Sequence, residues 1–103
     1  MTNLSGKQKK RLRALGQKLE PAVHIGKGGL SEPVLQTADE ALDRHELIKV
    51  RLPSQLGPPE RKALAAELAE SLRAVCPGLV GKVALLYRPN PELDISKRVD
   101  PGE

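Results

Sequence analysis

The sequence predicts a single small α/β domain in which a four-stranded mixed sheet packs against helices. The chain of 103 residues can bury one compact core but not two. Its apolar residues follow helical or strand spacing in the order helix, strand, helix, strand, helix, strand, strand. Helices between the first three strands favour crossover connections and a mainly parallel sheet, to which the final hairpin would add an antiparallel edge.

The first helix is expected to begin at Ser5, because Ser5 and Gln8 have the spacing of a capping box. Three leucines then recur at helical spacing while cations fill most other positions: Leu12, Leu15 and Leu19. This pattern indicates a short amphipathic helix with a basic exposed side. Pro21 ends it, since the residue before proline is disfavoured in the α region. The apolar run 22–25 predicts a buried strand.

The second helix is expected to start at Ser31, a favourable N-cap, and to end near His45. Its apolar stripe consists of Val34, Leu35, Ala38, Ala41 and Leu42. Residues 47–52 then predict a strand, because they alternate from Ile48 onward. The core side of that strand would hold Ile48, Val50 and Leu52. Lys49 and Arg51 would lie on its outer, basic side.

The third helix is expected after the proline-rich loop 53–59 and is predicted to stop at the Cys-Pro-Gly sequence of residues 76–78. Its apolar positions are Leu64, Ala65, Leu68, Ala69 and Leu72. Gly81 and Lys82 have the order of a type II′ hairpin turn between two final strands. From residue 90 the sequence has proline and charge but no sustained period. We therefore expect a domain at 1–89 and a mobile or loosely docked tail at 90–103.

The charge of the chain favours an anionic partner. It has 17 Lys and Arg against 13 Asp and Glu, a formal net charge of +4. Six cations precede the first acid, Glu20: Lys7, Lys9, Lys10, Arg11, Arg13 and Lys18. With one Tyr and no Phe or Trp, aromatic base stacking cannot be the main binding device.

Several function classes lack support in the sequence. Cys76 is the single cysteine, which rules out an internal disulfide and suits a cytoplasmic protein. No signal peptide or bilayer-spanning apolar run is found. Two His and one Cys, far apart in the chain, do not have metal-site spacing. No acid, base and nucleophile set can be assembled, so we expect no enzyme activity, cofactor or small-molecule substrate.

The isolated His, Cys and Tyr side chains receive structural interpretations. His24 is expected in a strand, and His45 near a helix end, where it favours the helix dipole. Cys76 is expected to be a buried structural thiol, since no base partner is apparent. Tyr87 is expected to contribute to strand packing rather than to stack on a base.

The glycine-rich loop after the first strand has three possible chemistries and one ligand-free alternative. A P-loop requires Ser or Thr after its lysine, whereas Gly28 follows Lys27. A dinucleotide fingerprint requires glycine at the sixth place, which is Ser31, although Glu46 has suitable spacing for a ribose contact. A Gly-x-x-Gly loop at 26–29 could clamp a nucleic-acid backbone. The four residues alone fit a tight turn that needs no ligand equally well.

Four motifs together resemble the CRM domain, the chloroplast RNA splicing and ribosome maturation domain, in its free-standing bacterial YhbY form. They are "LSGKQKKRLRALG", "IGKGGL", "HELIKVRL" and "LYRP", within residues 3–89. The resemblance implies an RNA-binding fold like the C-terminal domain of bacterial initiation factor three. It also implies association with large-subunit rRNA in pre-50S particles, with the family's glycine loop at Gly26, Lys27, Gly28 and Gly29.

We therefore predict a non-enzymatic, monomeric RNA-binding factor for ribosome assembly. Its expected RNA-binding residues are Gly26, Lys27, Gly28, Gly29, Lys7, Lys9, Lys10, Arg11, Arg13, Lys49 and Arg51. The alternative is a small adaptor that binds a ribosomal or translation protein, with the basic residues serving only solubility and docking.

Overall fold

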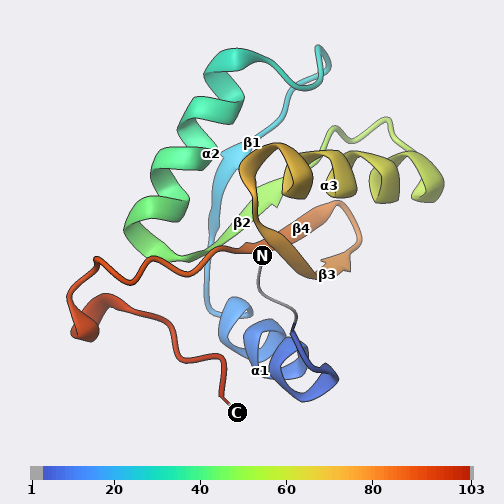
Figure 1. Ribbon diagram of the computed structural model, residues 1–103. Helices are drawn as coiled ribbons and strands as arrows, with labels where there is room; N and C mark the ends of the chain where they lie inside the picture. The colour runs from blue at the N-terminus through green and yellow to red at the C-terminus, as the bar shows by residue number, and fades with distance from the viewer. Residues whose placement is uncertain (1–3, 103) are drawn as a thin grey trace.

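Three helices cover both faces of one four-stranded sheet in the computed structural model, which describes residues 4–102 (Figure 1). The elements are α1 (Gly6–Gly16), β1 (Pro21–His24), α2 (Glu32–His45), β2 (Leu47–Arg51), α3 (Pro58–Leu72), β3 (Val75–Val80), β4 (Val83–Tyr87) and η1 (Ile95–Lys97). The predicted order of helices and strands is confirmed. Residues 1–3 and 103, at the ends of the predicted domain and tail, lie outside the described residues. Within residues 4–102 no helix is both long enough and apolar enough to cross a membrane.

The sheet has the strand order β1-β2-β4-β3. β1 pairs with β2 in parallel, whereas β2–β4 and β3–β4 are antiparallel. The mixed sheet is confirmed, but the expectation that it is mainly parallel is wrong. The final hairpin folds inward, so that β4 lies between β2 and β3 instead of extending the edge. This position suits the apolar sequence of β4, because a central strand between two helical layers is buried on both faces.

The third helix ends earlier than predicted, at Leu72. Arg73 follows in the left-handed conformation with φ of 55°, and its backbone N–H donates to the carbonyls of the last helical turn. The Cys-Pro-Gly sequence therefore belongs to β3. Pro77 is tolerated there because β3 is an edge strand. The outer side of an edge strand has no partner strand, so a missing N–H on that side removes no hydrogen bond of the sheet. Gly81 has φ of 57°, as the predicted hairpin turn requires.

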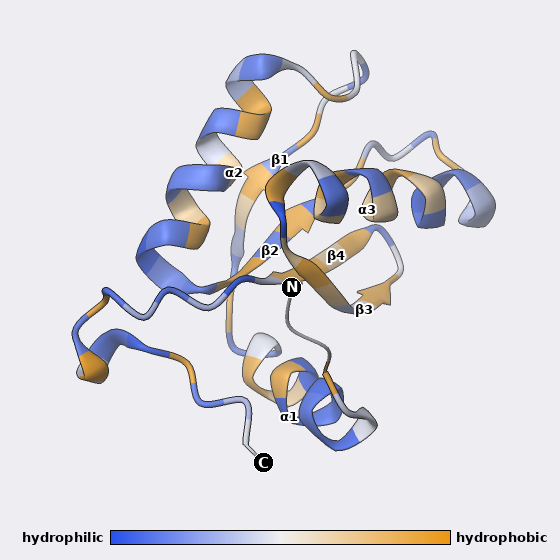
Figure 2. Cartoon of the chain, in the orientation of Figure 1, coloured by the Kyte–Doolittle hydropathy of each residue, from blue (hydrophilic) through white to orange (hydrophobic). Residues whose placement is uncertain are grey.

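The two faces of the sheet belong to two separate apolar clusters. The inner face packs against α2 and α3 through Ala38, Leu42, Ile48, Val50, Leu52, Leu68 and Leu86. Figure 2 shows hydrophobic residues along the strands and on the sheet-facing sides of these helices. The outer face packs against α1 through Leu12, Leu47, Leu85 and Tyr87. The predicted core side of β2 is confirmed, and Lys49 and Arg51 lie on the outer face, which α1 covers only in part.

The segment after β4 runs past the end of α2 and returns to α1 (Figure 1). Its anchor is Glu46, which is fully buried and has φ of 62° directly after α2. The Glu46 carboxylate accepts hydrogen bonds from the backbone N–H groups of Asn90 and of Val99, the latter at 2.6 Å. It also pairs with the Arg98 Nε at 3.1 Å. This segment thus has defined contacts with the domain, whereas its predicted mobility stays a prediction.

Candidate nucleic-acid interface

Helix α1 concentrates positive charge on one side of the molecule. It carries five cations and no acid, and all five are exposed: Lys7, Lys9, Lys10, Arg11 and Arg13. The predicted capping box is present, since the Ser5 hydroxyl accepts from the Gln8 N–H at 3.0 Å and Gln8 Oε1 accepts from the Ser5 N–H at 2.9 Å. Leu12 and Gly16 face the sheet and fix the helix there. The cations therefore point away from the core.

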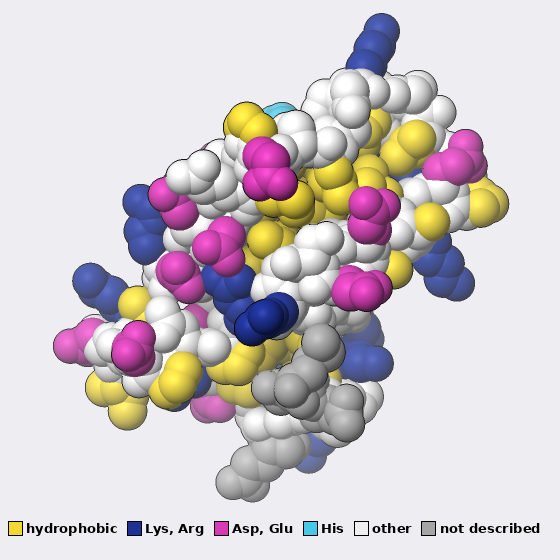
Figure 3. All heavy atoms as spheres, turned by 45° about the horizontal axis from the view of Figure 1, so that its top comes forward, with side chains coloured by type: hydrophobic (Ala, Val, Ile, Leu, Met, Phe, Trp, Pro, Cys, Tyr) yellow, Lys and Arg dark blue, Asp and Glu magenta, His cyan; other side chains and the backbone are white. Residues whose placement is uncertain are grey.

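Helices α2 and α3, on the other face of the sheet, have a net negative charge, although Arg88 pairs with Asp39 and Asp43 of α2. Helices α2 and α3 together carry seven acids and only three Lys or Arg. Figure 3 shows acidic side chains spread over the α2–α3 face around an apolar strip. Because an RNA backbone is repelled by such a face, the α1 side is the electrostatically favoured surface for RNA.

Three of the predicted RNA-binding cations meet at one groove between α1 and the outer face of the sheet. The groove has a volume of about 560 Å³ and is bordered by Arg13, Lys49 and Arg51. Its remaining lining is mainly small or apolar: Gly16, Gln17, Pro21, Gly78, Val80, Val83 and Leu85. These three cations, up to 38 positions apart in the chain, thus lie around one groove whose lining is mainly apolar.

Arg13 is held in place at this groove. Its Nη1 donates to the Pro77 carbonyl oxygen at 3.0 Å. Its aliphatic stem lies against Gly78, where an added Cβ would be 2.8 Å from Arg13 Cδ. Any larger residue at position 78 would therefore displace this arginine. Gly78 is a positioning residue that the sequence analysis missed, because its contact with Arg13 lies 65 positions away in the chain.

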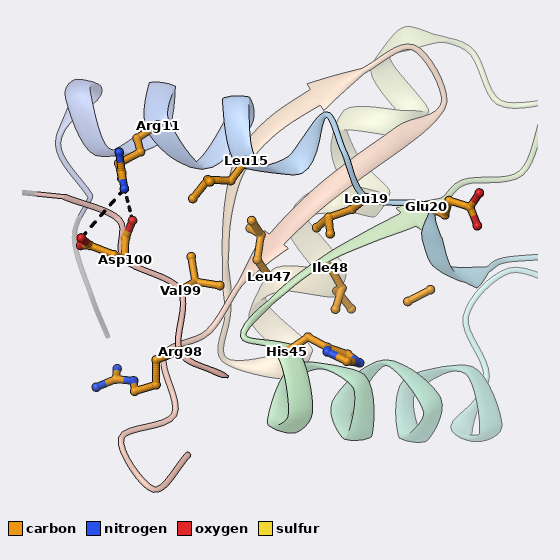
Figure 4. Close-up of a pocket in the computed structure, with 11 residues that line it drawn as sticks. Arg11, Leu15, Leu19, Glu20, His45, Leu47, Ile48, Arg98, Val99 and Asp100 are labelled. Carbon is orange, nitrogen blue, oxygen red and sulfur yellow. Dashed lines mark hydrogen bonds and ion pairs between the residues drawn. The ribbon is translucent and has the colours of Figure 1, made fainter. Parts of the chain in front are cut away.

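The other α1 cations do not all face the groove. Lys9 borders a separate hollow beside Leu4 and Glu70. Arg11 turns toward the C-terminal segment, where its Nε donates to the Asp100 carbonyl at 2.8 Å and its Nη2 lies 3.9 Å from the Asp100 carboxylate (Figure 4). Lys7 and Lys10 are exposed. The cations of α1 thus point in several directions. Among them, Arg13 alone borders the groove.

The apolar hollow beneath the C-terminal segment lies on the other flank of α1. Leu15, Leu47 and Val99 come together there from the helix, the sheet and the segment (Figure 4). The hollow has a volume of about 500 Å³. Leu15 and Leu19 at its border are each 37% exposed. Its lining is apolar and its rim has both signs of charge, so this hollow is distinct in character from the basic groove.

The glycine loop is a tight turn in which only one glycine is required by the backbone. The Gly29 N–H donates to the Gly26 carbonyl at 3.0 Å. Gly29 has φ of 76°, whereas Gly26 and Gly28 lie outside the left-handed region. A Cβ added at Gly26 or Gly28 would meet no atom within 4 Å. The fold therefore does not explain glycine at these two positions, whereas close approach of a ligand backbone would.

The loop begins beside the groove but borders the acidic side as well. The Ile25 N–H donates to the Arg51 carbonyl at 2.9 Å, which places the start of the loop beside the basic end of β2. On the other side, Lys27 and Gly29 border a shallow hollow that also includes Glu60 and Glu67 of α3. Glu60 and Glu67 would repel an anion that approached the loop from this side. Glu46 is buried against the C-terminal segment, which removes the ribose contact considered for a dinucleotide.

The isolated reactive side chains have structural environments. Tyr87 is buried in the outer core, which confirms its packing role. Its pKa is raised, mainly by this burial and to a lesser extent by the nearby Glu46 carboxylate. Cys76 is only partly buried, in contrast to the predicted buried thiol, and this burial raises its pKa. His24 is exposed and lies in register with Arg51, and His45 is exposed in the last turn of α2. Among residues 4–102 no group of three His, Cys, Asp or Glu side chains could hold a metal.

Comparisons with known proteins match most of this chain. The model of the CRS1 / YhbY (CRM) domain matches residues 4–88. A probable RNA-binding protein of Pseudomonas aeruginosa is 39% identical over 89 residues, which are 86% of this chain and 85% of the relative. An RNA-binding protein of Haemophilus influenzae is 38% identical over 95 residues, 92% of this chain and 95% of the relative. The solution structure of a candidate RNA-binding protein from Staphylococcus aureus has a TM-score of 0.78 and 36% identity, and the match covers 89% of this chain and 95% of that one.

Proposed function

Because the chain belongs to the CRS1 / YhbY (CRM) domain family, we propose that it is an RNA-binding protein that acts in ribosome assembly. Its ligand would be large-subunit rRNA in pre-50S particles, and it would act as a cytoplasmic monomer without catalysis. One observation carries the proposal: cations occupy α1 and the outer sheet face, while acids occupy α2 and α3. Relatives named as RNA-binding proteins support it.

The mechanism would be electrostatic positioning of an RNA backbone. Lys49 and Arg51 border the groove and would each neutralise a phosphate, and Arg13 beside them would add to the positive potential. The glycine loop would add backbone N–H groups at the start of α2, where the helix dipole favours an anion. Lys27 would add a full positive charge beside them. Because phosphate contacts carry no base information, this part of the surface would recognise RNA shape rather than sequence.

The test of the ribosomal role is cosedimentation. A protein bound to rRNA that becomes covered in the finished subunit must leave before assembly ends. We expect the tagged chain in gradient fractions of immature large subunits and its near absence from polysomes. Equal recovery from small-subunit and polysome fractions would contradict the proposal.

The salt dependence of RNA binding tests the electrostatic mechanism. If about five phosphates are neutralised, log affinity should fall with log salt concentration at a slope of about −3.5 to −4.5. Filter binding of an rRNA fragment at a series of salt concentrations measures this slope. Tight binding with a flat salt response would exclude phosphate neutralisation as its source.

Substitutions in the glycine loop test the clamp. Lys27→Ala should weaken RNA binding by about 1 kcal/mol, or about fivefold, without changing the melting temperature. Gly28→Asp should weaken it further, because a carboxylate would stand where the phosphate approaches while the fold has room for it.

Gly29→Ala is the structural control for the loop. It should lower the stability by about 1–2 kcal/mol, because alanine is strained at φ of 76°. If the Lys27 and Gly28 variants bind as the unmodified protein does, the loop is a turn and not a clamp.

A second candidate function is an adaptor for a ribosomal or translation protein. The apolar hollow beside the half-exposed Leu15 and Leu19 favours it, because such a hollow can receive an apolar side chain (Figure 4). Ribonuclease treatment of the immature particles distinguishes the two functions. Release of the chain by ribonuclease supports RNA binding, and retention on the protein remnants supports the adaptor.

A further inference from the structure

We propose that the groove between α1 and the outer sheet face binds one unpaired nucleotide of the RNA. The base would lie on the apolar floor against the Arg13 guanidinium, and its flanking phosphates would meet Lys49 and Arg51. This inference rests on the proposed function and specifies its ligand: RNA with a bulged or looped-out nucleotide, rather than a continuous double helix.

The composition of the groove carries the first step. Its rim has three cations, whereas its floor is formed by aliphatic side chains such as Val83 and Leu85. A surface that only tracks phosphates needs no apolar floor. In a continuous helix the base faces are stacked inside, so that this floor would have nothing to bury. A single unpaired nucleotide has both an apolar base face and an adjacent anionic phosphate, which matches the two parts of the lining.

The size and shape of the groove carry the second step. A volume of about 560 Å³ lies within the range of about 300–1,000 Å³ that small-molecule sites occupy. Two glycines set this shape. A Cβ at Gly16 would be 2.8 Å from Leu85 Cδ1, and one at Gly78 would be 2.8 Å from Arg13 Cδ. The absence of these two side chains lets α1 and Arg13 approach the sheet closely and form a defined wall.

The orientation of Arg13 carries the third step. Unstacked RNA bases are bound by aromatic rings or by the planes of arginine guanidinium groups. The chain has one Tyr and no Phe or Trp, and Tyr87 is 3% exposed in the outer core. Among the residues that line the groove, the planar cationic groups are therefore those of Arg13 and Arg51. The Pro77 carbonyl fixes Arg13 Nη1 at 3.0 Å, so the guanidinium is held before any ligand arrives.

The spacing of the other two cations carries the fourth step. Lys49 and Arg51 are two residues apart on β2, so their side chains leave the same face about 7 Å apart. Both lie at the groove and can contact successive phosphates on either side of one nucleotide. The β2 cations thus form a row that an RNA backbone could follow toward the glycine loop after Ile25.

The experiment compares two RNA hairpins with the same stem, one fully paired and one with a single bulged uridine. Fluorescence anisotropy at one fixed salt concentration should give about tenfold tighter binding of the bulged RNA, which gains the base contact. Arg13→Lys keeps the charge but removes the planar guanidinium. We expect it to reduce the ratio of the two affinities to about 2. Arg44→Lys on α2 makes the same chemical change away from the groove and should keep the tenfold ratio.

The outcomes separate this inference from the proposed function. Equal affinity of the unmodified protein for both hairpins would overturn the nucleotide site while leaving RNA binding intact. An unchanged ratio in Arg13→Lys would also overturn it, because the base would then lie elsewhere. Failure to bind either hairpin or rRNA would contradict the proposed function itself. Displacement of the bulged RNA by polyglutamate as readily as by unlabelled bulged RNA would show a site for charge alone and would overturn the inference. Melting temperatures of both variants verify that they fold.

Discussion

Reversing three charges together, as Lys10→Glu, Arg13→Glu and Arg51→Glu, is expected to weaken the binding of large-subunit rRNA by at least about 100-fold. Each lost charge-assisted contact contributes about 1 kcal/mol, so that three contacts amount to about 3 kcal/mol. The new carboxylates add repulsion at the same surface. Titration of a labelled rRNA fragment at one fixed salt concentration measures the change.

The matched control is the triple variant Arg44→Glu, Lys62→Glu and Lys97→Glu. It has the same net charge, but its changes lie in α2, α3 and η1, away from the groove. We expect it to lose much less affinity. An equal loss in both variants would show that net charge decides binding and that the surface formed by α1 and the groove has no special role. The melting temperature is measured beside affinity, because Arg13 also donates to the Pro77 carbonyl.

Removing the buried carboxylate with Glu46→Ala is expected to lower the free energy of unfolding by about 3 kcal/mol. The carboxylate accepts from Asn90 and Val99 and pairs with Arg98, so alanine would leave these groups without their partner. For a domain of this size the melting temperature should fall by about 15 °C. Chemical denaturation gives the free energy directly.

Two further variants show whether the loss of stability in Glu46→Ala comes from the missing carboxylate. Glu46→Gln retains one acceptor oxygen and the shape of the side chain, and should fall between the unmodified protein and Glu46→Ala. Glu40→Ala changes an exposed glutamate of α2 and should alter stability by less than about 0.5 kcal/mol. If Glu46→Ala is no more destabilising than Glu40→Ala, the segment after β4 does not contribute to the stability of the domain.

Local signals in the sequence predicted most elements of the fold. The Ser5 and Gln8 pair located the start of α1, and Gly81 located the hairpin, because each motif acts within four residues. Arg73 gave no such signal, since a non-glycine residue after a helix seldom adopts positive φ. Pro77 is typical of a helix end, although the same residue is acceptable in an edge strand. β4 lies at the centre of the sheet because helices bury both of its faces. No local sequence pattern specifies this position.

The candidate site was predictable in its residue types but not in its grouping. The alternation around Lys49 and Arg51 placed both on the outer face correctly. Their meeting with Arg13 depends on how α1 crosses the sheet, and that crossing depends on the packing of Gly16 against Leu85. Local sequence indicates no structural role for Glu46, because its partners lie 44 to 53 positions later in the chain.

The docking of the C-terminal segment on α1 has a practical consequence for labelling the protein. The Gln8 side chain donates to the Gly102 carbonyl at 2.9 Å, so the end of the described chain lies at the start of the basic helix. A fluorophore attached there would stand beside the proposed RNA surface and could report binding through quenching. A bulky or acidic purification tag at the same end would instead compete with RNA for α1. Affinities measured with such a tag should therefore be compared with those of the chain after the tag is cleaved.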